Sequence, residues 1–189
     1  NLGLVADGRG DFTLAIDRYQ AALAIARELD DPAGVASCLA NIGFAALEQG
    51  RHATAAEHFR QSLGLFRQVG DQRNLGAVLD SLGVLAFREG DFARAAALQA
   101  EALTLLQAVG DRQGVADALA NAGHTMQRMG DLTGAERHYA DALIRYRELG
   151  DQSGVAFALT HLGRLATELG DLGRVAAAAQ APQDGGESS

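Results

Sequence analysis

Apolar residues recur along this chain with the period of an α-helix. Between residues 52 and 69 the apolar positions fall at steps of three and four: Ala55, Phe59, Leu63 and Phe66. The same positions are apolar between residues 132 and 149: Ala135, Tyr139, Leu143 and Tyr146. Such spacing places the apolar side chains on one face of a helix. The pattern therefore predicts an all-α protein built from amphipathic helices.

Glycine-containing dipeptides show that these helices form a repeat. One dipeptide returns every forty residues: Leu2-Gly3, Ile42-Gly43, Leu82-Gly83, Ala122-Gly123 and Leu162-Gly163. Further breakers come about every twenty residues: Gly10-Asp11, Asp30-Asp31, Gly50-Arg51, Gly70-Asp71, Gly90-Asp91, Gly110-Asp111, Gly130-Asp131, Gly150-Asp151 and Gly170-Asp171. Glycine can take the left-handed conformation that ends a helix, and aspartate can cap the next helix. Because the turns are short, neighbouring helices must run antiparallel.

The breakers divide the chain into helices with these expected ranges: 1–9, 12–29, 32–49, 52–69, 72–89, 92–109, 112–129, 132–149, 152–169 and 172–181. The last helix begins normally and then loses the pattern, and residues 182–189 have the composition of a disordered tail. We therefore expect one repeat solenoid over residues 1–181, with a truncated first repeat and a degenerate last one. Because Asn1 already lies in the middle of a repeat, we expect the chain to be a piece of a longer protein.

Composition argues against several classes of partner. The formal net charge of −8 disfavours the phosphates of nucleic acid and an anionic membrane surface. No apolar run approaches the length of a membrane span. The single cysteine, Cys38, cannot form an internal disulfide, which favours a reducing, cytoplasmic location. All sixteen basic residues are arginine and alanine is abundant, a bias typical of a bacterial genome rich in G and C.

No catalytic or cofactor-binding motif stands out. The glycines do not form a dinucleotide- or phosphate-binding loop, and the chain has no lysine for a P-loop. Helix capping explains the aspartates that follow the helix ends. Cys38 has no histidine at catalytic or metal-binding spacing, so we expect a buried structural thiol. We therefore expect no enzymatic activity, no cofactor and no metal.

The residue pattern resembles the tetratricopeptide repeat. That family has a Leu-Gly pair in the first helix, a Gly-Asp turn, and then alanine, an aromatic residue and Ala-Leu in the second helix. One copy here consists of Asn41-Ile42-Gly43, Gly50, Ala55, Phe59, Ser62 and Leu63. Another consists of Asn121-Ala122-Gly123, Gly130, Ala135, Tyr139, Ala142 and Leu143.

The forty-residue period departs from the common repeat, which has about 34 residues and a proline near its end. We expect the additional residues to lengthen each helix. Repeats of this length resemble those of kinesin light chains, of spindle-orientation adaptors, and of large bacterial ATP-dependent regulators of the LuxR-like and antibiotic-regulator type. The composition is most similar to that of the last group.

The resemblance implies a right-handed αα-solenoid of antiparallel helix pairs, whose first helices line a concave groove. Partner-binding residues would lie just before and after the Leu-Gly pair. In this chain those positions hold Asn41, Phe44, Ser81, Arg88, Asn121, His124, Arg128, His161 and Arg164. A chaperone-tail adaptor is not expected, because the position of its clamp lysine holds Ala40, Asp80, Ala120 or Thr160.

The resemblance thus implies a non-enzymatic scaffold that binds a protein or peptide segment. Donors would gather on one wall of the groove, with Asp117 as a weak acidic competitor, which favours an acidic or carboxylate-bearing segment. This scaffold would belong to a larger bacterial signalling or regulatory protein. Two alternatives stay open. One is a domain of a transcription-regulator ATPase that senses a peptide or small effector, and the other is an accessory repeat domain of an enzyme whose catalytic part is absent here.

Overall fold

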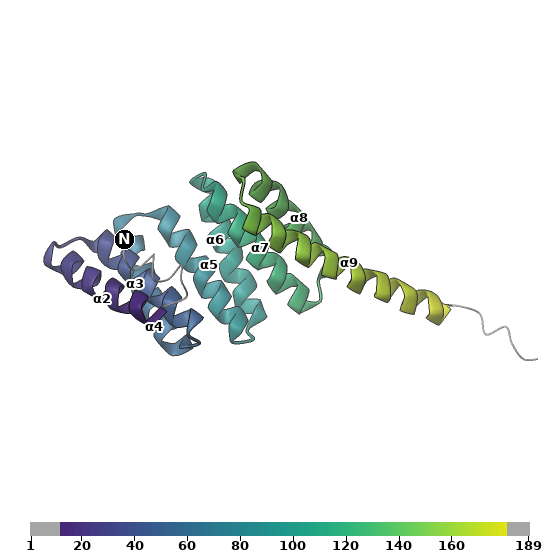
Figure 1. Cartoon of the computed structure of the whole chain (residues 1–189), viewed down its shortest axis with the longest axis horizontal. Helices are drawn as coiled ribbons and strands as arrows, with labels where there is room; N and C mark the ends of the chain where they lie inside the picture. Colours follow the sequence, from purple (N-terminus) through teal and green to yellow (C-terminus); the bar gives the residue numbers. More distant parts are fainter. Residues whose placement is uncertain (1–11, 181–189) are drawn as a thin grey trace, which may run out of the picture.

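The computed structural model describes residues 12–180, with side chains for residues 12–170. This part of the chain forms α-helices and no strand: α2 (Phe12–Glu28), α3 (Pro32–Glu48), α4 (His52–Val69), α5 (Gln72–Arg88), α6 (Phe92–Ala108), α7 (Arg112–Met129), α8 (Leu132–Leu149) and α9 (Gln152–Gln180). Helix α3 packs closely on α4, α5 on α6 and α7 on α8. The helices follow one another along the long axis of the molecule (Figure 1). The all-α solenoid is therefore confirmed.

The predicted turns form by the predicted chemistry. A glycine in the left-handed conformation stands at each of six helix ends: Gly50, Gly70, Gly90, Gly110, Gly130 and Gly150. An aspartate then caps the next helix in most cases. The Asp111 carboxylate, for example, follows Gly110 and accepts a hydrogen bond of 3.0 Å from the backbone N–H of Gly114. Such a cap satisfies an amide that the helix itself leaves unpaired. The twenty-residue spacing of breakers is thus a spacing of capped turns.

The turn predicted at Gly170-Asp171 is wrong, because α9 continues through these residues to Gln180. Gly170 is not among the glycines with positive φ. The segment after it reads Val175 and then four alanines, the residue with the highest helix propensity. It also has alanine at position 179, where earlier repeats place Phe59 or Tyr139. The helix therefore has little to gain from folding back. The helix predicted over 1–9 and the tail 182–189 lie outside the described residues.

Close contact between small and large residues holds each helix pair together. A Cβ atom added at Gly43 would lie 2.8 Å from the Phe59 ring, and one added at Gly123 would lie 3.0 Å from the Tyr139 ring. These glycines let the backbones approach until an aromatic ring fills the space between them. The helix pair between these two, α5 and α6, departs from this pattern, because the side chain that packs against Gly83 is Gln99. Gln99 is 1% exposed, and its Oε1 has no hydrogen-bond partner.

Within the described residues, no helix has both the length and the apolar character needed to cross a bilayer. This includes α9, the longest of them.

Candidate functional site

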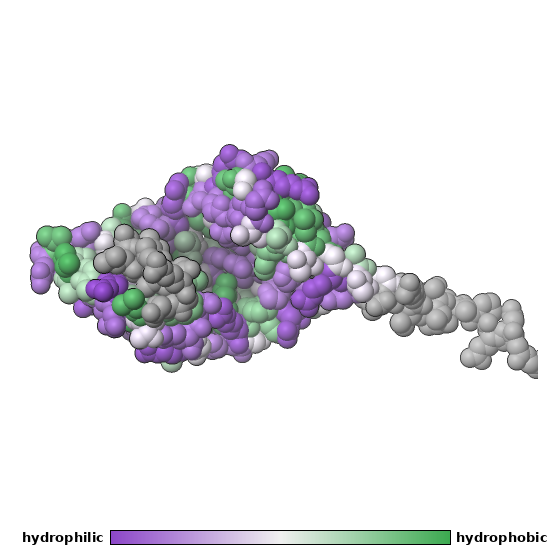
Figure 2. Space-filling view, viewed as in Figure 1, coloured by the Kyte–Doolittle hydropathy of each residue, from purple (hydrophilic) through white to green (hydrophobic). Residues whose placement is uncertain are grey.

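The first helices of successive repeats, α3, α5, α7 and α9, carry every residue predicted to bind a partner. Helix α3 contacts α5, and α5 contacts α7. The space-filling view shows a hollow in the visible face of the solenoid, with hydrophobic residues exposed inside it (Figure 2). We divide the surface formed by these helices, here called the concave face, into a cleft between α3 and α5, a junction between α5 and α7, and a row of rings from α5 to α9.

The cleft between α3 and α5 has a volume of about 380 Å³. Its lining has no charged residue and combines apolar with polar side chains: Ser37, Ala40, Asn41, Phe44, Phe66, Asn74, Ala77, Val78 and Ser81. Three predicted residues, Asn41, Phe44 and Ser81, therefore come together here. Phe44 is 42% exposed, unusual for a large apolar side chain. Asn41 makes no side-chain hydrogen bond with any described residue, so its amide can pair with a ligand.

The junction between α5 and α7 uses a predicted residue internally. The Asn121 amide donates a hydrogen bond of 2.7 Å to Asp80 Oδ2. The other oxygen, Oδ1, is inaccessible and has no partner. Burial raises the pKa of Asp80 to about 6, because the charged form loses water; the Asn121 hydrogen bond lowers this pKa and nearby Asp117 raises it. Asn121 therefore stabilises the contact between two repeats.

Asp117 is held by its own partners at this junction. It accepts hydrogen bonds of 2.8 Å from the Tyr146 hydroxyl and 3.2 Å from the Gln113 amide. The Gln113 amide also donates a hydrogen bond of 3.2 Å to Asp151, which directly precedes α9. Burial raises the pKa of Asp117 as well. With Asp80 beside it, Asp117 is more than a lone acidic competitor, and the middle of the concave face is acidic.

The row of rings crosses from α5 to α9. It consists of Phe92, Phe87, His124, His161 and Tyr139, with Phe157 beside its end. The centroids of Phe87 and His124 lie 4.4 Å apart, and those of His124 and His161 lie 5.3 Å apart. His161 stacks on Tyr139 at 4.9 Å, and its Nδ1 lies 3.2 Å from the Tyr139 hydroxyl. The structure thus brings together two predicted histidines that are distant in sequence.

The surroundings of the two histidines lower both of their pKa values. Burial is the largest cause for each of them. The positive charge of Arg164 acts on both, and His161 and Arg128 add to the effect on His124. A positively charged neighbour makes a second positive charge unfavourable. Both imidazoles are therefore neutral at about pH 7.

The predicted arginines have different roles. Arg88 forms a salt bridge with Glu48 and donates a hydrogen bond of 2.9 Å to the backbone oxygen of Leu47, so it ties α5 to α3. Arg128 instead lies over the Phe92 ring, 5.3 Å from its centroid. Arg128 and Arg164 are exposed, and neither forms a salt bridge with a described residue. Two of the three arginines are therefore available to a ligand.

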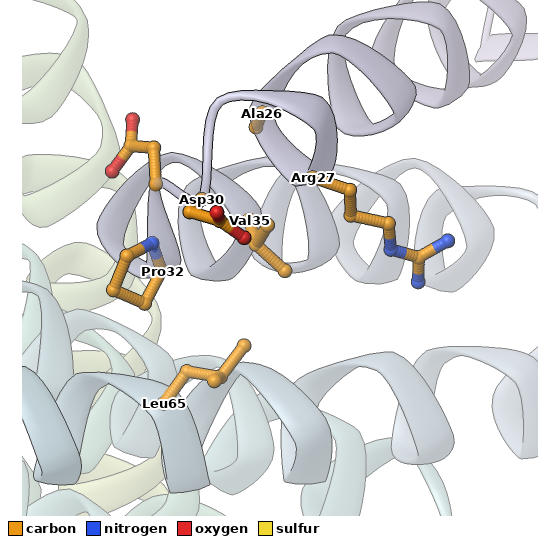
Figure 3. A pocket seen from close by; sticks show the side chains of 7 residues that line it. Ala26, Arg27, Asp30, Pro32, Val35 and Leu65 are labelled. Carbon is orange, nitrogen blue, oxygen red and sulfur yellow. The ribbon is translucent and has the colours of Figure 1, made fainter.

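A second hollow lies outside the predicted groove, where α2, α3 and α4 meet. In Figure 3, Leu65 of α4 points toward Pro32 and Val35 across an open space. Its volume is about 270 Å³. A hollow of about 260 Å³ occurs at the equivalent positions two repeats later, around Val115 and Arg145. This recurrence shows that the hollow is a product of the repeat geometry.

The described side chains can be compared with the requirements of a metal site and of a reactive thiol. No group of three or more His, Cys, Asp or Glu residues among them is placed to hold a metal ion. The Cys38 thiol is partly buried, and burial followed by the charge of Asp31 raises its pKa. A raised pKa keeps the thiol protonated and unreactive.

Fold and surface together define a helical-repeat solenoid with an open concave face. The chain belongs to the tetratricopeptide repeat family, whose model matches residues 1–68, 35–108 and 74–143. This family match supports a protein-interaction scaffold.

Solved structures share the fold. BtubC (BKLC) from P. vanneervenii superposes with a TM-score of 0.76 and 22% identity, over 100% of this chain and 83% of that one. A Rap protein complexed with competence and sporulation factor gives 0.81 and 19%, over 93% of this chain and 49% of its own length. A putative kinesin light chain from Podospora anserina gives 0.68 and 12%, over 90% and 84%. No curated protein matches the chain. Identities this low show the fold alone.

Proposed function

We propose that this chain is a non-enzymatic scaffold that binds an extended peptide segment along the concave face. The observation that carries the proposal is a set of donors on that face without a hydrogen-bond or salt-bridge partner among the described residues: the Asn41 amide and the Arg128 and Arg164 guanidinium groups. A preformed helical surface also lowers the ordering cost of binding on the receptor side. A Rap protein of this fold has been solved in complex with competence and sporulation factor, which supports ligand binding by such a solenoid.

The segment carries a carboxylate. Arg128 and Arg164 border the row of rings, and a guanidinium group can meet a carboxylate with two hydrogen bonds. Asn41 would bond the backbone of the segment, and the exposed Phe44 ring would pack against an apolar side chain. The acidic junction between α5 and α7 lies between these two regions, so negative groups of the segment should avoid it.

We further propose that the scaffold works inside a larger bacterial regulatory protein in the cytoplasm. The chain spans 49% of the Rap protein, and its composition is similar to that of the large bacterial regulators. The peptide-sensing ATPase and the accessory domain of an enzyme are the alternative parents. A sequence containing a P-loop beside these repeats would favour the first, and one containing a catalytic domain would favour the second.

Peptide selection followed by mutation tests the proposed binding surface. Random peptides are displayed on phage, selected on the whole chain, and measured by fluorescence anisotropy. Replacing Arg128 and Arg164 together by alanine should lower the affinity for the selected peptide by about tenfold to a hundredfold, because charged hydrogen bonds are lost. The melting temperature should change little, because both side chains are exposed.

The matched control replaces two exposed arginines on second helices, Arg94 and Arg137, by alanine. This pair removes the same net charge from the other side of the solenoid. The affinity of this control variant for the selected peptide should stay within about twofold of that of the unmodified chain, because the removed charges are remote from the ligand. Loss of binding in the control pair alone would contradict the proposal.

A further inference from the structure

His124 and His161 stand at the centre of the ring row, between Phe87 on one side and Tyr139 on the other. The charged and titratable groups around them come from three helices. Helix α7 contributes Arg128, α8 contributes Tyr139, and α9 contributes Arg164 and Glu168. Helices α5 and α6 contribute the Phe87 and Phe92 rings.

The one carboxylate in this group is already engaged. Glu168 accepts a hydrogen bond of 2.9 Å from the Gln127 amide. Its charge acts on Tyr139, whereas the charged neighbours that act on the two histidines are positive. The pair of histidines therefore lies among positive and aromatic groups, without a negative partner among the described residues.

We propose that His124 and His161 form a carboxylate-binding pair that takes up protons when the acidic segment binds. This inference rests on the proposed function and specifies how that site is regulated. The ligand carboxylate supplies the negative charge that the free site lacks. Protonation then gives each imidazole a positive charge and an N–H on both ring nitrogens, so that its hydrogen bond to the carboxylate becomes charge-assisted.

The surroundings of each imidazole can accommodate the added proton. Burial raises the pKa of Tyr139, so its hydroxyl stays protonated and can donate to His161 Nδ1 in the free site. In the protonated site, Nδ1–H donates to the Tyr139 oxygen and Nε2–H remains for the ligand. His124 makes no hydrogen bond with a described residue, and the Phe87 ring beside it favours a cation at close range.

The direction of the pH effect follows from linkage. Burial and positive neighbours hold both pKa values below the ordinary histidine range in the free site. A bound carboxylate raises them toward or above that range. The complex therefore binds more protons than the free chain, and affinity increases as the pH falls through the histidine range.

Proton NMR of the whole chain tests the inference with tetraglutamate as the acidic probe and tetraglutamine as the neutral one. Tetraglutamate should raise the titration midpoints of His124 and His161, and tetraglutamine should leave them unchanged. The resonances of His58 and His138, on second helices, serve as internal references. Affinity for tetraglutamate should be about tenfold higher near pH 5.5 than near pH 7.5, the factor that corresponds to one pKa unit.

Replacing both His124 and His161 by glutamine should remove that pH dependence and keep most of the affinity near pH 7.5. Replacing His58 and His138 by glutamine is the matched control, because it makes the same two substitutions on second helices. Circular dichroism checks that both variants keep their helices.

The outcomes separate this inference from the proposed function. In one outcome, binding of a selected peptide requires Arg128 and Arg164, but tetraglutamate leaves the titration midpoints of both histidines unchanged. That result overturns the histidine pair and keeps the peptide scaffold. In another outcome, tetraglutamate raises the titration midpoints of both histidines, but no selected peptide binds to the concave face. That result keeps the carboxylate-binding pair and overturns the peptide scaffold. Equal pH dependence in the two glutamine variants also overturns the pair.

Discussion

Asn41 and Asn121 occupy the same position two repeats apart, the first in the cleft between α3 and α5 and the second at the junction between α5 and α7. Asn121 donates its amide to the buried carboxylate of Asp80, whereas Asn41 lines an open cleft with its amide unpaired. The repeat determines which face a side chain occupies. The residue opposite, on the next first helix, determines whether that side chain is available to a ligand.

Arg88 and Arg128 also contrast a side chain that pairs with the neighbouring repeat and one that does not. Arg88 meets Glu48 on the neighbouring first helix and closes a contact between repeats. Arg128 has no carboxylate partner among the described residues and lies on the Phe92 ring, where it remains exposed. Position within the repeat therefore selects candidates for binding, and contacts between repeats remove some of them.

The largest expected difference in unfolding free energy is between substitutions of two glycines in distant repeats, Gly43 in α3 and Gly163 in α9. Gly43→Ala places a Cβ 2.8 Å from the ring of Phe59, which is 1% exposed and cannot move away. Overpacking of this kind costs about 1–3 kcal/mol of unfolding free energy. Gly163→Ala meets no described atom within 4 Å, so higher helix propensity should stabilise the chain by about 0.5–1 kcal/mol. Urea denaturation measures both, and equal effects would contradict the assigned contact between α3 and α4.

Substitutions of the two asparagines should give the next largest difference in unfolding free energy. Asn121→Ala leaves the Asp80 carboxylate buried without its hydrogen bond, a loss of about 1.5–3 kcal/mol. Asn41→Ala removes an unpaired amide and should change the unfolding free energy by less than about 0.5 kcal/mol. For affinity toward a selected peptide, Asn41→Ala should be the more harmful change. A stability loss in Asn41→Ala as large as that in Asn121→Ala would remove the distinction between the two regions.

Asp80→Asn should stabilise the chain at neutral pH. Because burial raises the pKa of Asp80 to about 6, above its value in the unfolded chain, its contribution to stability is fully present below about pH 4 and is lost as the pH rises through about 6. Asparagine removes this penalty and can still accept from Asn121. We expect a gain of about 1–2 kcal/mol near pH 7.5 that disappears near pH 4. Urea denaturation at both pH values checks it, and a gain that does not depend on pH would rule out the ionisation of Asp80 as its cause.

The smallest effect concerns the middle helix pair, α5 and α6. Gln99→Leu removes a buried oxygen without a partner and keeps a side chain of similar size against Gly83. It should raise the unfolding free energy by about 1 kcal/mol. Gln68→Leu, at an exposed position, is the control and should stay within about 0.5 kcal/mol. A destabilised Gln99→Leu variant would show that the glutamine is better satisfied than its contacts indicate.

Local rules predicted most of the fold. Glycine conformation and aspartate capping act within a few residues, so the turns could be placed from dipeptides alone. The turn at Gly170-Asp171 failed because a dipeptide allows a turn but does not supply the packing that makes it favourable. At Gly50 and Gly130 the following helix brings Phe59 or Tyr139 to a glycine of the preceding one.

The candidate site was less predictable, because its chemistry depends on residues from neighbouring repeats. Asn121 pairs with Asp80, Arg88 with Glu48 and Gln127 with Glu168, each about one period apart in sequence. A search for complementary side chains at that spacing in first helices would have found these pairs. The ring row had only part of such a signal: Phe87, His124 and His161 follow one another at steps of 37 residues, whereas Phe92 and Tyr139 join from α6 and α8 at other spacings.

The central claim is that ligands bind to the first helices of this scaffold. Amide NMR spectra of the ¹⁵N-labelled chain, recorded with and without a phage-selected peptide, test it most directly. The account predicts chemical-shift changes concentrated on α3, α5, α7 and α9, including Asn41, His124 and His161. Changes confined to α2, α4, α6 and α8, or to the outer hollow around Leu65, would contradict it.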